Sequence, residues 1–351
     1  MSLLDNASHR RLNPLTGEWV IVSPHRTARP WRGQEEDLSV VDRPAYDSTC
    51  YLCPGNQRAN AERNPRYGGV FAFDNDFPAL TPDAPPDGLD DNGLLVARGE
   101  PGICRVVCFS ERHDLTLSRM QVCDIVRVVE AWREEHRRLG ALEFIDYVQI
   151  FENRGAMMGA SNPHPHCQIW ATRSLPNEIV KETRSQNDYL TRKKSCLLCD
   201  YLALEEKLGE RVVCRNDHFT ALVPFWAAWP FETMVLPRRH IGAFDDFGGE
   251  ETYAFAEILR LLTVRYDNLF KSPFPYSMGF HQRPTDRERH PAWHFHAHFY
   301  PPLLRSAAVR KFMVGFELLG SPQRDITPEA GARRLRDLPT THYAESVGDS
   351  G

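Results

Sequence analysis

The chain has 351 residues, a formal net charge of -5, 25% charged residues and 42% hydrophobic residues. This composition is ordinary for a soluble globular protein, and the length fits one large domain or two fused smaller ones. Because there is no excess of basic residues, wholesale binding to a nucleic-acid backbone is not expected, and we predict no nucleic-acid partner.

The N-terminal run MSLLDNASHRRLNPL has no apolar core of signal-peptide length, and two prolines interrupt the longest apolar stretch, residues 221–231. We therefore expect a cytoplasmic protein with no membrane partner. Nine cysteines in a chain without an export signal predict reduced thiols, some of them metal ligands, and not a disulfide framework.

The first half of the chain presents a Cys-x-x-Cys pair, an Asn-Asp pair, a histidine, a helix, a strand and a histidine-rich run. These are Cys50 and Cys53, Asn75 and Asp76, His113, a helix that ends before Gly140, a strand from Tyr147 to Glu152, and His164-Pro-His166-Cys-Gln168. The helix is indicated by apolar residues at helical spacing, and Ser118 and Gln121 form a capping-box pattern at its start.

The second half repeats this order. It holds Cys196 and Cys199, Asn216 and Asp217, His240, a helix over roughly residues 250–270, a strand from Tyr276 to His281, and His294-Phe-His296-Ala-His298. The interval from the lone histidine to the histidine-rich run is 51 residues in the first half (113 to 164) and 54 in the second (240 to 294), which indicates duplication. We predict an α+β fold with one unit over residues 1–185, a second over 186–340 and a flexible tail over 341–351.

Three sets of side chains have the composition of metal sites. They are Cys50, Cys53, His113 and His164; Cys196, Cys199, His240 and His294; and Glu182, His281, His296 and His298. Two thiolates with two imidazoles suit tetrahedral zinc, whereas one carboxylate with three imidazoles suits iron or zinc. The alternatives are buried apolar cysteines and hydrogen-bonded core histidines.

The run from His164 to Gln168 has a further property. Alternate residues of an extended strand point to one side, so His164, His166 and Gln168 lie together. If His164 faces a metal, His166 is the remaining imidazole, which is a competent nucleophile toward phosphorus near neutral pH. The Gln168 amide can donate a hydrogen bond to a phosphoryl oxygen without giving or taking a proton.

Two neighbouring segments can hold phosphate oxygens. Residues 153–161 form a glycine-containing loop whose NH groups and Ser161 hydroxyl can donate hydrogen bonds. Arg26 and Arg29 can add bidentate contacts, although a solvated arginine pair is the simpler interpretation.

Several longer runs occur together in one order. They are Asn13-Pro-Leu-Thr-Gly, Ser23-Pro-His-Arg, Cys50-Tyr-Leu-Cys53, Asn75-Asp-Phe, Phe151-Glu-Asn, Ser161-Asn-Pro-His-Pro-His166, Trp226-Ala-Ala-Trp-Pro-Phe-Glu232, His296-Ala-His-Phe-Tyr-Pro-Pro-Leu-Leu-Arg305 and Val309-Arg-Lys-Phe-Met-Val-Gly315. In these runs the chain resembles the galactose-1-phosphate uridylyltransferase family of the histidine-triad superfamily, from about Asn13 to Leu338. The resemblance implies a homodimer of subunits that each contain duplicated histidine-triad-like units, with antiparallel sheets and flanking helices.

The resemblance also implies a ping-pong exchange. His166 attacks the α-phosphorus of UDP-glucose, glucose 1-phosphate leaves, and galactose 1-phosphate takes the uridylyl group to give UDP-galactose. Gln168 stands where hydrolytic relatives carry a histidine. The implied substrate contacts are Asn75, Asp76 and Phe77 at the uridine; Arg26, Arg29, Asn153, Gly159 and Ser161 at the phosphates; and Lys311, Phe312, Val314, Glu317 and Gln323 at the hexose, across the dimer interface.

The sequence departs from the well-known bacterial form of this family in its second half. That form has iron at the positions of Glu182, His281, His296 and His298, and lacks ligands at those of Cys196, Cys199 and His294. Related nucleotide-sugar phosphorylases carry these residues together with the counterpart of His240, so we predict a second zinc there. The alternative activities are an adenylyl or guanylyl phosphorylase or hydrolase that uses the same histidine, and a zinc-stabilised nucleotide-binding or scaffold protein without enzymatic activity.

Overall fold

The computed structural model of the chain describes Leu4 and residues 7–28, 43–85, 87–304, 310–311 and 313–345. For residues 303, 304, 310 and 311 it describes the backbone alone.

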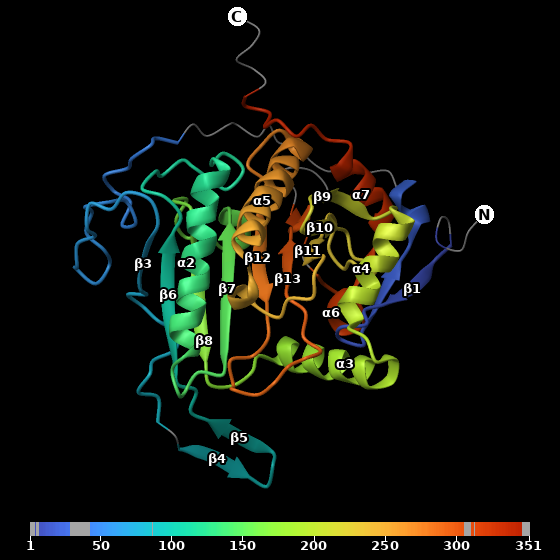
Figure 1. Cartoon of the computed structure of the whole chain (residues 1–351), viewed down its shortest axis with the longest axis horizontal. Coiled ribbons are helices and arrows are strands. Elements are labelled where there is room, and N and C mark those ends of the chain that lie inside the picture. Colours follow the sequence, from blue (N-terminus) through green and yellow to red (C-terminus); the bar gives the residue numbers. More distant parts are fainter. Residues whose placement is uncertain are drawn as a thin grey trace, which may run out of the picture.

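A single nine-stranded sheet forms the centre of the molecule (Figure 1). In spatial order its strands are β3 (Phe71–Asp74), β6 (Gly102–Cys108), β8 (His166–Thr172), β7 (Tyr147–Arg154), β12 (Tyr276–His281), β13 (His296–Tyr300), β11 (Thr233–Pro237), β10 (Phe219–Leu222) and β9 (Val212–Arg215). All neighbouring pairs in this sheet are antiparallel. The predicted α+β class is confirmed.

The two halves of the chain contribute matching parts to this sheet. The first half gives β6, helix α2 (Val122–Gly140), β7 and β8, and the second gives β11, helix α5 (Gly249–Phe270), β12 and β13. The order β6-β8-β7 on one side of the centre is mirrored by β12-β13-β11 on the other. Strands β7 and β12 pair directly at the junction, so one sheet runs through both halves. The predicted domain boundary between residues 185 and 186 stays a prediction.

Helices α2 and α5 lie side by side across one face of the sheet (Figure 1). The apolar stripe of α2 is buried, and the indole of Trp132 lies 4.9 Å from the Phe280 ring, centre to centre, while its Nε1 donates to the sulfur of Cys167. The strand residues that point toward the helices therefore form the hydrophobic core, and the residues between them point to the opposite face.

The predicted capping box of α2 is wrong. Gln121 occupies the N-cap position without a side-chain cap, and Ser118 lies outside the helix. The Ser118 hydroxyl instead donates to the buried carboxylate of Asp267 at 2.5 Å, and Gly140 is the last residue of the helix. A tertiary partner thus replaced the local one that the pattern indicated.

The remaining elements surround the sheet. They are strands β1 (His9–Leu12), β2 (Trp19–Val22) and β16 (Gln323–Arg324), which form a small sheet; the hairpin β4 (Gly88–Asp91) and β5 (Leu95–Arg98); the pair β14 (Leu303–Leu304) and β15 (Arg310–Lys311); the short helices η1 (Pro24–Ala28), η2 (Ala156–Met158) and η3 (Phe244–Asp246); and α3 (Asn177–Lys193), α4 (Leu197–Leu208), α6 (Phe316–Leu319) and α7 (Pro328–Arg336). Within the described ranges, no helix is both long and apolar enough to cross a membrane.

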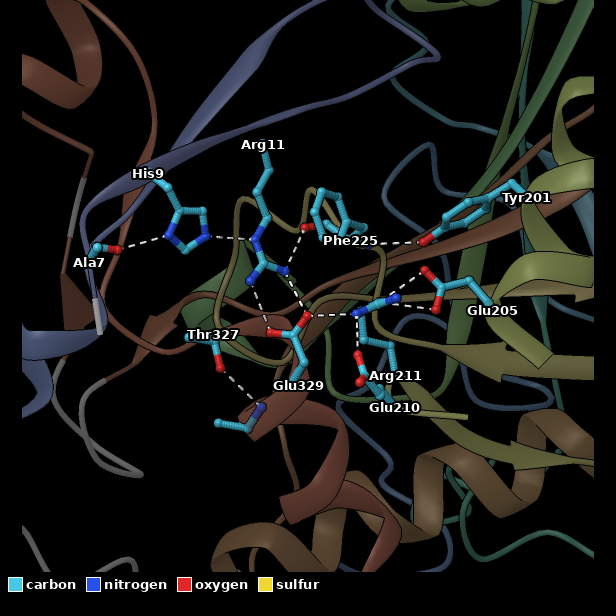
Figure 2. A network of polar contacts seen from close by, with 11 residues as sticks. Ala7, His9, Arg11, Tyr201, Glu205, Glu210, Arg211, Phe225, Thr327 and Glu329 are labelled. Atoms are coloured by element: carbon cyan, nitrogen blue, oxygen red, sulfur yellow. Dashed lines mark hydrogen bonds and ion pairs between the residues drawn. The ribbon is translucent and has the colours of Figure 1, made fainter. Parts of the chain in front are cut away.

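A buried polar network ties the N-terminal strand β1 to the C-terminal helix α7 (Figure 2). The guanidinium of Arg11 donates to both carboxylate oxygens of Glu329, at 2.8 and 3.0 Å, and lies over the Phe225 ring. Arg211 donates to the same Glu329 at 2.7 Å and also pairs with Glu205. Strand β1 is therefore held against helix α7 by paired charges.

Candidate active site and metal clusters

The first Cys/His set comes together on the face of the sheet opposite α2 and α5. Cys50, Cys53, His113 and His164 are all buried, and one ligand atom of each lies within 4.8 Å of the others. The Cys53 sulfur lies 3.6 Å from Nδ1 of His113 and 3.5 Å from Nδ1 of His164. The cluster is compatible with a bound metal ion.

The surroundings of His164 favour the tautomer and the neutral state that a metal ligand requires. Its Nε2 lies 2.9 Å from the carbonyl oxygen of Ser110, which requires Nε2 to carry the proton and leaves the Nδ1 lone pair facing the cysteine. Burial lowers the pKa of His164 to about 4, so the ring is neutral at physiological pH.

The second Cys/His set repeats this geometry. Cys196 is the N-cap of α4, and the Cys199 sulfur lies 3.5 Å from Nδ1 of both His240 and His294. The two Nδ1 atoms are 3.3 Å apart. His294 Nε2 lies 3.1 Å from the Pro237 carbonyl oxygen, the counterpart of the bond from His164 to Ser110.

The third set also comes together, around Glu182 of α3. One carboxylate oxygen lies 2.9 Å from Nδ1 of His281, and the other lies 3.2 Å from Nε2 of His296. His298 completes the cluster. A cavity of about 500 Å³ reaches Glu182, His281 and His298 and is partly lined by the aromatic rings of Trp226 and Trp229.

His166 begins β8 and lies half-buried beside the first cluster. Its Nδ1 is 2.7 Å from the carbonyl oxygen of His164, so Nδ1 carries the proton and Nε2 carries the lone pair. Burial lowers the pKa of His166, which keeps the imidazole unprotonated near neutral pH. This is the state that a nucleophile requires.

Two amides lie on the same face as His166. Gln168 is two residues further along β8, and its Oε1 lies 3.2 Å from the indole Nε1 of Trp170. Asn153 is the next-to-last residue of β7 and is partly buried. Its Oδ1 accepts a hydrogen bond from the Ser277 hydroxyl at 2.7 Å. In both amides the oxygen accepts a hydrogen bond from a neighbouring side chain. The NH₂ groups can therefore donate elsewhere.

The predicted phosphate loop follows β7 and contains the short helix η2. Gly155 and Gly159 have φ angles of 87° and 81°, a backbone conformation that favours glycine. The Ser161 hydroxyl lies at the end of this loop, 3.3 Å from the hydroxyl of Tyr51. The loop thus leads directly from Asn153 to the histidine run.

The predicted uridine residues follow the edge strand β3. Asn75 accepts from the backbone NH of Phe77, whose ring is 75% exposed. The Asp76 carboxylate forms an ion pair with Arg58 at 3.4 Å, and the Arg58 guanidinium lies over the Phe73 ring. A cavity of about 460 Å³ borders these side chains except Phe77. Arg58 was not among the predicted site residues, because no sequence pattern links it to Asp76.

The residues expected at the hexose lie together with Arg26, which was expected at the phosphates. Arg26 pairs with Asp325 at 3.2 Å, Gln323 donates to the same carboxylate, and Glu317 pairs with Arg324. Val314 is exposed. Arg29, Phe312 and the Lys311 side chain lie outside the described residues.

Comparison with known proteins identifies the family of the chain. The family models "Galactose-1-phosphate uridyl transferase, N-terminal domain" and "C-terminal domain" match residues 1–176 and 182–347. The galactose-1-phosphate uridylyltransferase of Haemophilus influenzae is 51% identical over 337 residues, which cover 96% of each chain. That of Rattus norvegicus is 49% identical over 344 residues, covering 97% of this chain and 90% of the relative.

Solved structures give the same result. A uridylyltransferase structure superposes with a TM-score of 0.74 at 28% identity, covering 93% of this chain and 97% of that one. An ADP-glucose phosphorylase from Arabidopsis thaliana has the same TM-score at 23% identity, covering 95% and 100%, and shares the fold. The full-length sequence matches and the superposed fold show that this chain belongs to the galactose-1-phosphate uridyl transferase family.

Proposed function

We propose that the chain is a nucleotidyltransferase that exchanges the uridylyl group between UDP-glucose and galactose 1-phosphate, giving glucose 1-phosphate and UDP-galactose. The observation that carries this proposal is the geometry of His166, which offers an Nε2 lone pair while its Nδ1 proton is held by the His164 carbonyl. The family membership supports the choice of substrates.

The reaction proceeds in two displacements at the same phosphorus. Nε2 of His166 bonds to the α-phosphorus of UDP-glucose, and the bond from that phosphorus to the bridging oxygen breaks, releasing glucose 1-phosphate. A phosphate oxygen of galactose 1-phosphate then attacks the same phosphorus, and Nε2 leaves with its electron pair. The proton on Nδ1 stays in place throughout, so neither step needs a general acid at this histidine.

Neighbouring side chains stabilise the charge that develops on the phosphoryl oxygens. The NH₂ groups of Gln168 and Asn153, whose oxygens are engaged by Trp170 and Ser277, donate to these oxygens. The NH groups and Ser161 hydroxyl of the loop extend the same site. Asp76 and Asn75 bind the uridine beside the cavity next to Arg58.

We assign zinc to both Cys/His clusters. Zinc bonds of about 2.3 Å to sulfur and about 2.0–2.1 Å to nitrogen, in a tetrahedron, separate sulfur from nitrogen by roughly 3.5 Å and two nitrogens by roughly 3.3 Å. The separations of 3.5 and 3.6 Å in the first cluster, and 3.5 and 3.3 Å in the second, match these values. The Glu182 cluster would hold iron or a further zinc.

The zinc ions would act structurally. At the first cluster an ion would fix the side chain of His164. The backbone carbonyl of the same residue orients the His166 ring. The second cluster would join the start of α4 to the segments just after β11 and just before β13. No zinc ligand of either cluster is needed for the displacement itself.

The protein would work as a cytoplasmic homodimer. Arg26 and Gln323 contact Asp325, and Glu317 of α6 pairs with Arg324. Helix α6 lies apart from strand β8, which begins at His166 (Figure 1). A partner subunit would therefore supply these residues to the hexose and phosphates of this chain's substrate. The two units would be residues 1–185 and 186–340.

Transfer of radiolabel from UDP-glucose to the protein tests the mechanism. Label from [α-32P]UDP-glucose should remain on the protein, stable to base and labile to acid, and should be released as UDP-galactose by galactose 1-phosphate. His166→Asn should carry no label, whereas His218→Asn, at a surface histidine, should label normally. Preferential labelling by ADP-glucose or GDP-glucose would favour the alternative phosphorylase or hydrolase instead.

A further inference from the structure

We propose that Trp170 is a positioning residue that sets the orientation of the Gln168 amide, so that its NH₂ group and not its oxygen faces the phosphoryl group. The inference rests on the proposed function of His166 and Gln168. It adds to that function a residue that does not itself touch the reacting atoms.

Only one direction is possible for the hydrogen bond between Trp170 and Gln168. The indole Nε1 of Trp170 lies 3.2 Å from the Gln168 amide oxygen. An indole N–H can only donate, so its partner must be an acceptor. The amide NH₂ is itself only a donor, which means that a flipped amide would place two donors against each other. The indole therefore favours one of the two amide orientations.

The position of Trp170 is itself well determined. It follows Gln168 by two residues on β8, so both side chains project from the same face. Its ring packs edge to face against Phe151, with ring centres 5.9 Å apart and the planes at 74°. Phe151 is the residue of β7 directly opposite Gln168. The indole and the amide thus share one pair of neighbouring strands.

The orientation matters because of the charge on the substrate. The non-bridging oxygens of the α-phosphate are negative and gain charge in the transition state. An NH₂ group stabilises them, whereas an amide oxygen in the same place repels them. A glutamine without the indole could occupy both orientations, and only one of them would support uridylyl transfer.

Removal of the indole donor tests the inference. Trp170→Phe keeps an aromatic ring against Phe151 and loses the N–H. We expect the single-turnover rate of uridylyl-His166 formation at saturating UDP-glucose to fall about fivefold, which is the loss expected for one hydrogen bond of about 1 kcal/mol. Tyr253→Phe, which removes a polar group from an aromatic side chain of α5 that is 54% exposed, should leave the rate unchanged.

A double-mutant cycle separates positioning from a general structural role. In a Gln168→Ala background there is no amide to orient, so Trp170→Phe should cause no further loss of rate. The thermal unfolding temperature of each variant checks that the fold is retained.

The outcomes are distinct. An unchanged rate in Trp170→Phe would overturn the inference. It would also be overturned if Trp170→Phe lowered the rate by the same factor in the wild-type chain and in the Gln168→Ala background. In both cases the proposed function would stand, provided that the wild-type chain is labelled at His166. A wild-type chain without label at His166 would overturn the proposed function and the inference together.

Discussion

Nδ1 of His166 lies 2.7 Å from the backbone carbonyl oxygen of His164, and the second half repeats this contact between His296 and His294 at 2.8 Å. In each half the backbone of one candidate metal ligand therefore orients the histidine two residues later. The two halves differ in the group that lies next to Nε2 of this histidine. Nε2 of His296 lies 3.2 Å from the Glu182 carboxylate, which makes this histidine a candidate ligand, whereas His166 lies in the proposed transfer site.

Loss of the first cluster should reduce both metal content and transfer. Cys53→Ser removes a ligand that lies within 3.6 Å of two histidines. Because the ion would fix His164, and His164 orients His166, we expect the variant to lose one zinc per chain, to unfold at a lower temperature and to form uridylyl-His166 more slowly. Metal analysis, thermal unfolding and the labelling rate test this. Cys123→Ser, at an exposed cysteine, should match the wild type in all three.

Loss of the second cluster should reduce metal content with a smaller effect on labelling. Cys196→Ser combined with Cys199→Ser removes both sulfur ligands of a cluster that belongs to the second half. We expect the purified variant to contain one zinc fewer per chain, because the remaining pair of histidines binds zinc weakly. A wild-type protein with only one zinc per chain, unchanged in this variant, would contradict the assignment.

Removal of the Ser277 hydroxyl should slow transfer moderately. Ser277 is part of β12 in the second half, but its hydroxyl donates to the Asn153 oxygen in the first. In Ser277→Ala the Asn153 amide loses the partner that orients its NH₂ group, so we expect a fall of about twofold to tenfold in the labelling rate. An unchanged single-turnover rate in a folded variant would show that this bond does not serve the site.

The contact between Glu329 and Arg11 should make stability depend on pH. Burial raises the pKa of the Glu329 carboxyl, but hydrogen bonds and charge from Arg11 and Arg211 outweigh it, so the folded-state pKa lies below the ordinary value. Its contribution is then fully present above the unfolded-state pKa of about 4.3 and is lost as the pH falls through the lower folded-state pKa.

Glu329→Gln tests this pH dependence. It leaves the fully buried Arg11 side chain without a carboxylate partner, and we expect a loss of about 3 kcal/mol in the free energy of unfolding at pH 7. Denaturant titrations at decreasing pH should show the difference from wild type shrinking. Glu18→Gln, which breaks a surface pair with Lys181, should cost less than about 1 kcal/mol. A difference for Glu329→Gln that is constant or grows on acidification would contradict the prediction.

The parts of the site that depend on local spacing could be predicted from the amino-acid sequence. The period of two along an extended strand puts His166 and Gln168 on one face of β8, whereas His164 lies in a bend just before the strand begins. Apolar periodicity placed the first long helix, and the repeat placed its counterpart, since α5 runs from Gly249 to Phe270 against an expected range of roughly 250–270. Repeated order along the chain also grouped the Cys/His sets that the structure brings within ligand distance.

Contacts between segments that are separated in the chain could not be predicted from local spacing, because they depend on how the elements pack. The bond from Ser118 to Asp267 replaced the predicted capping box, Arg58 reached Asp76, and β7 paired with β12 to join two units into one sheet. The orientation of the Asn153 amide depends on a hydroxyl from the other half. Local patterns specify which way a side chain leaves the backbone, whereas its hydrogen-bond partner is specified by the packing of distant strands and helices.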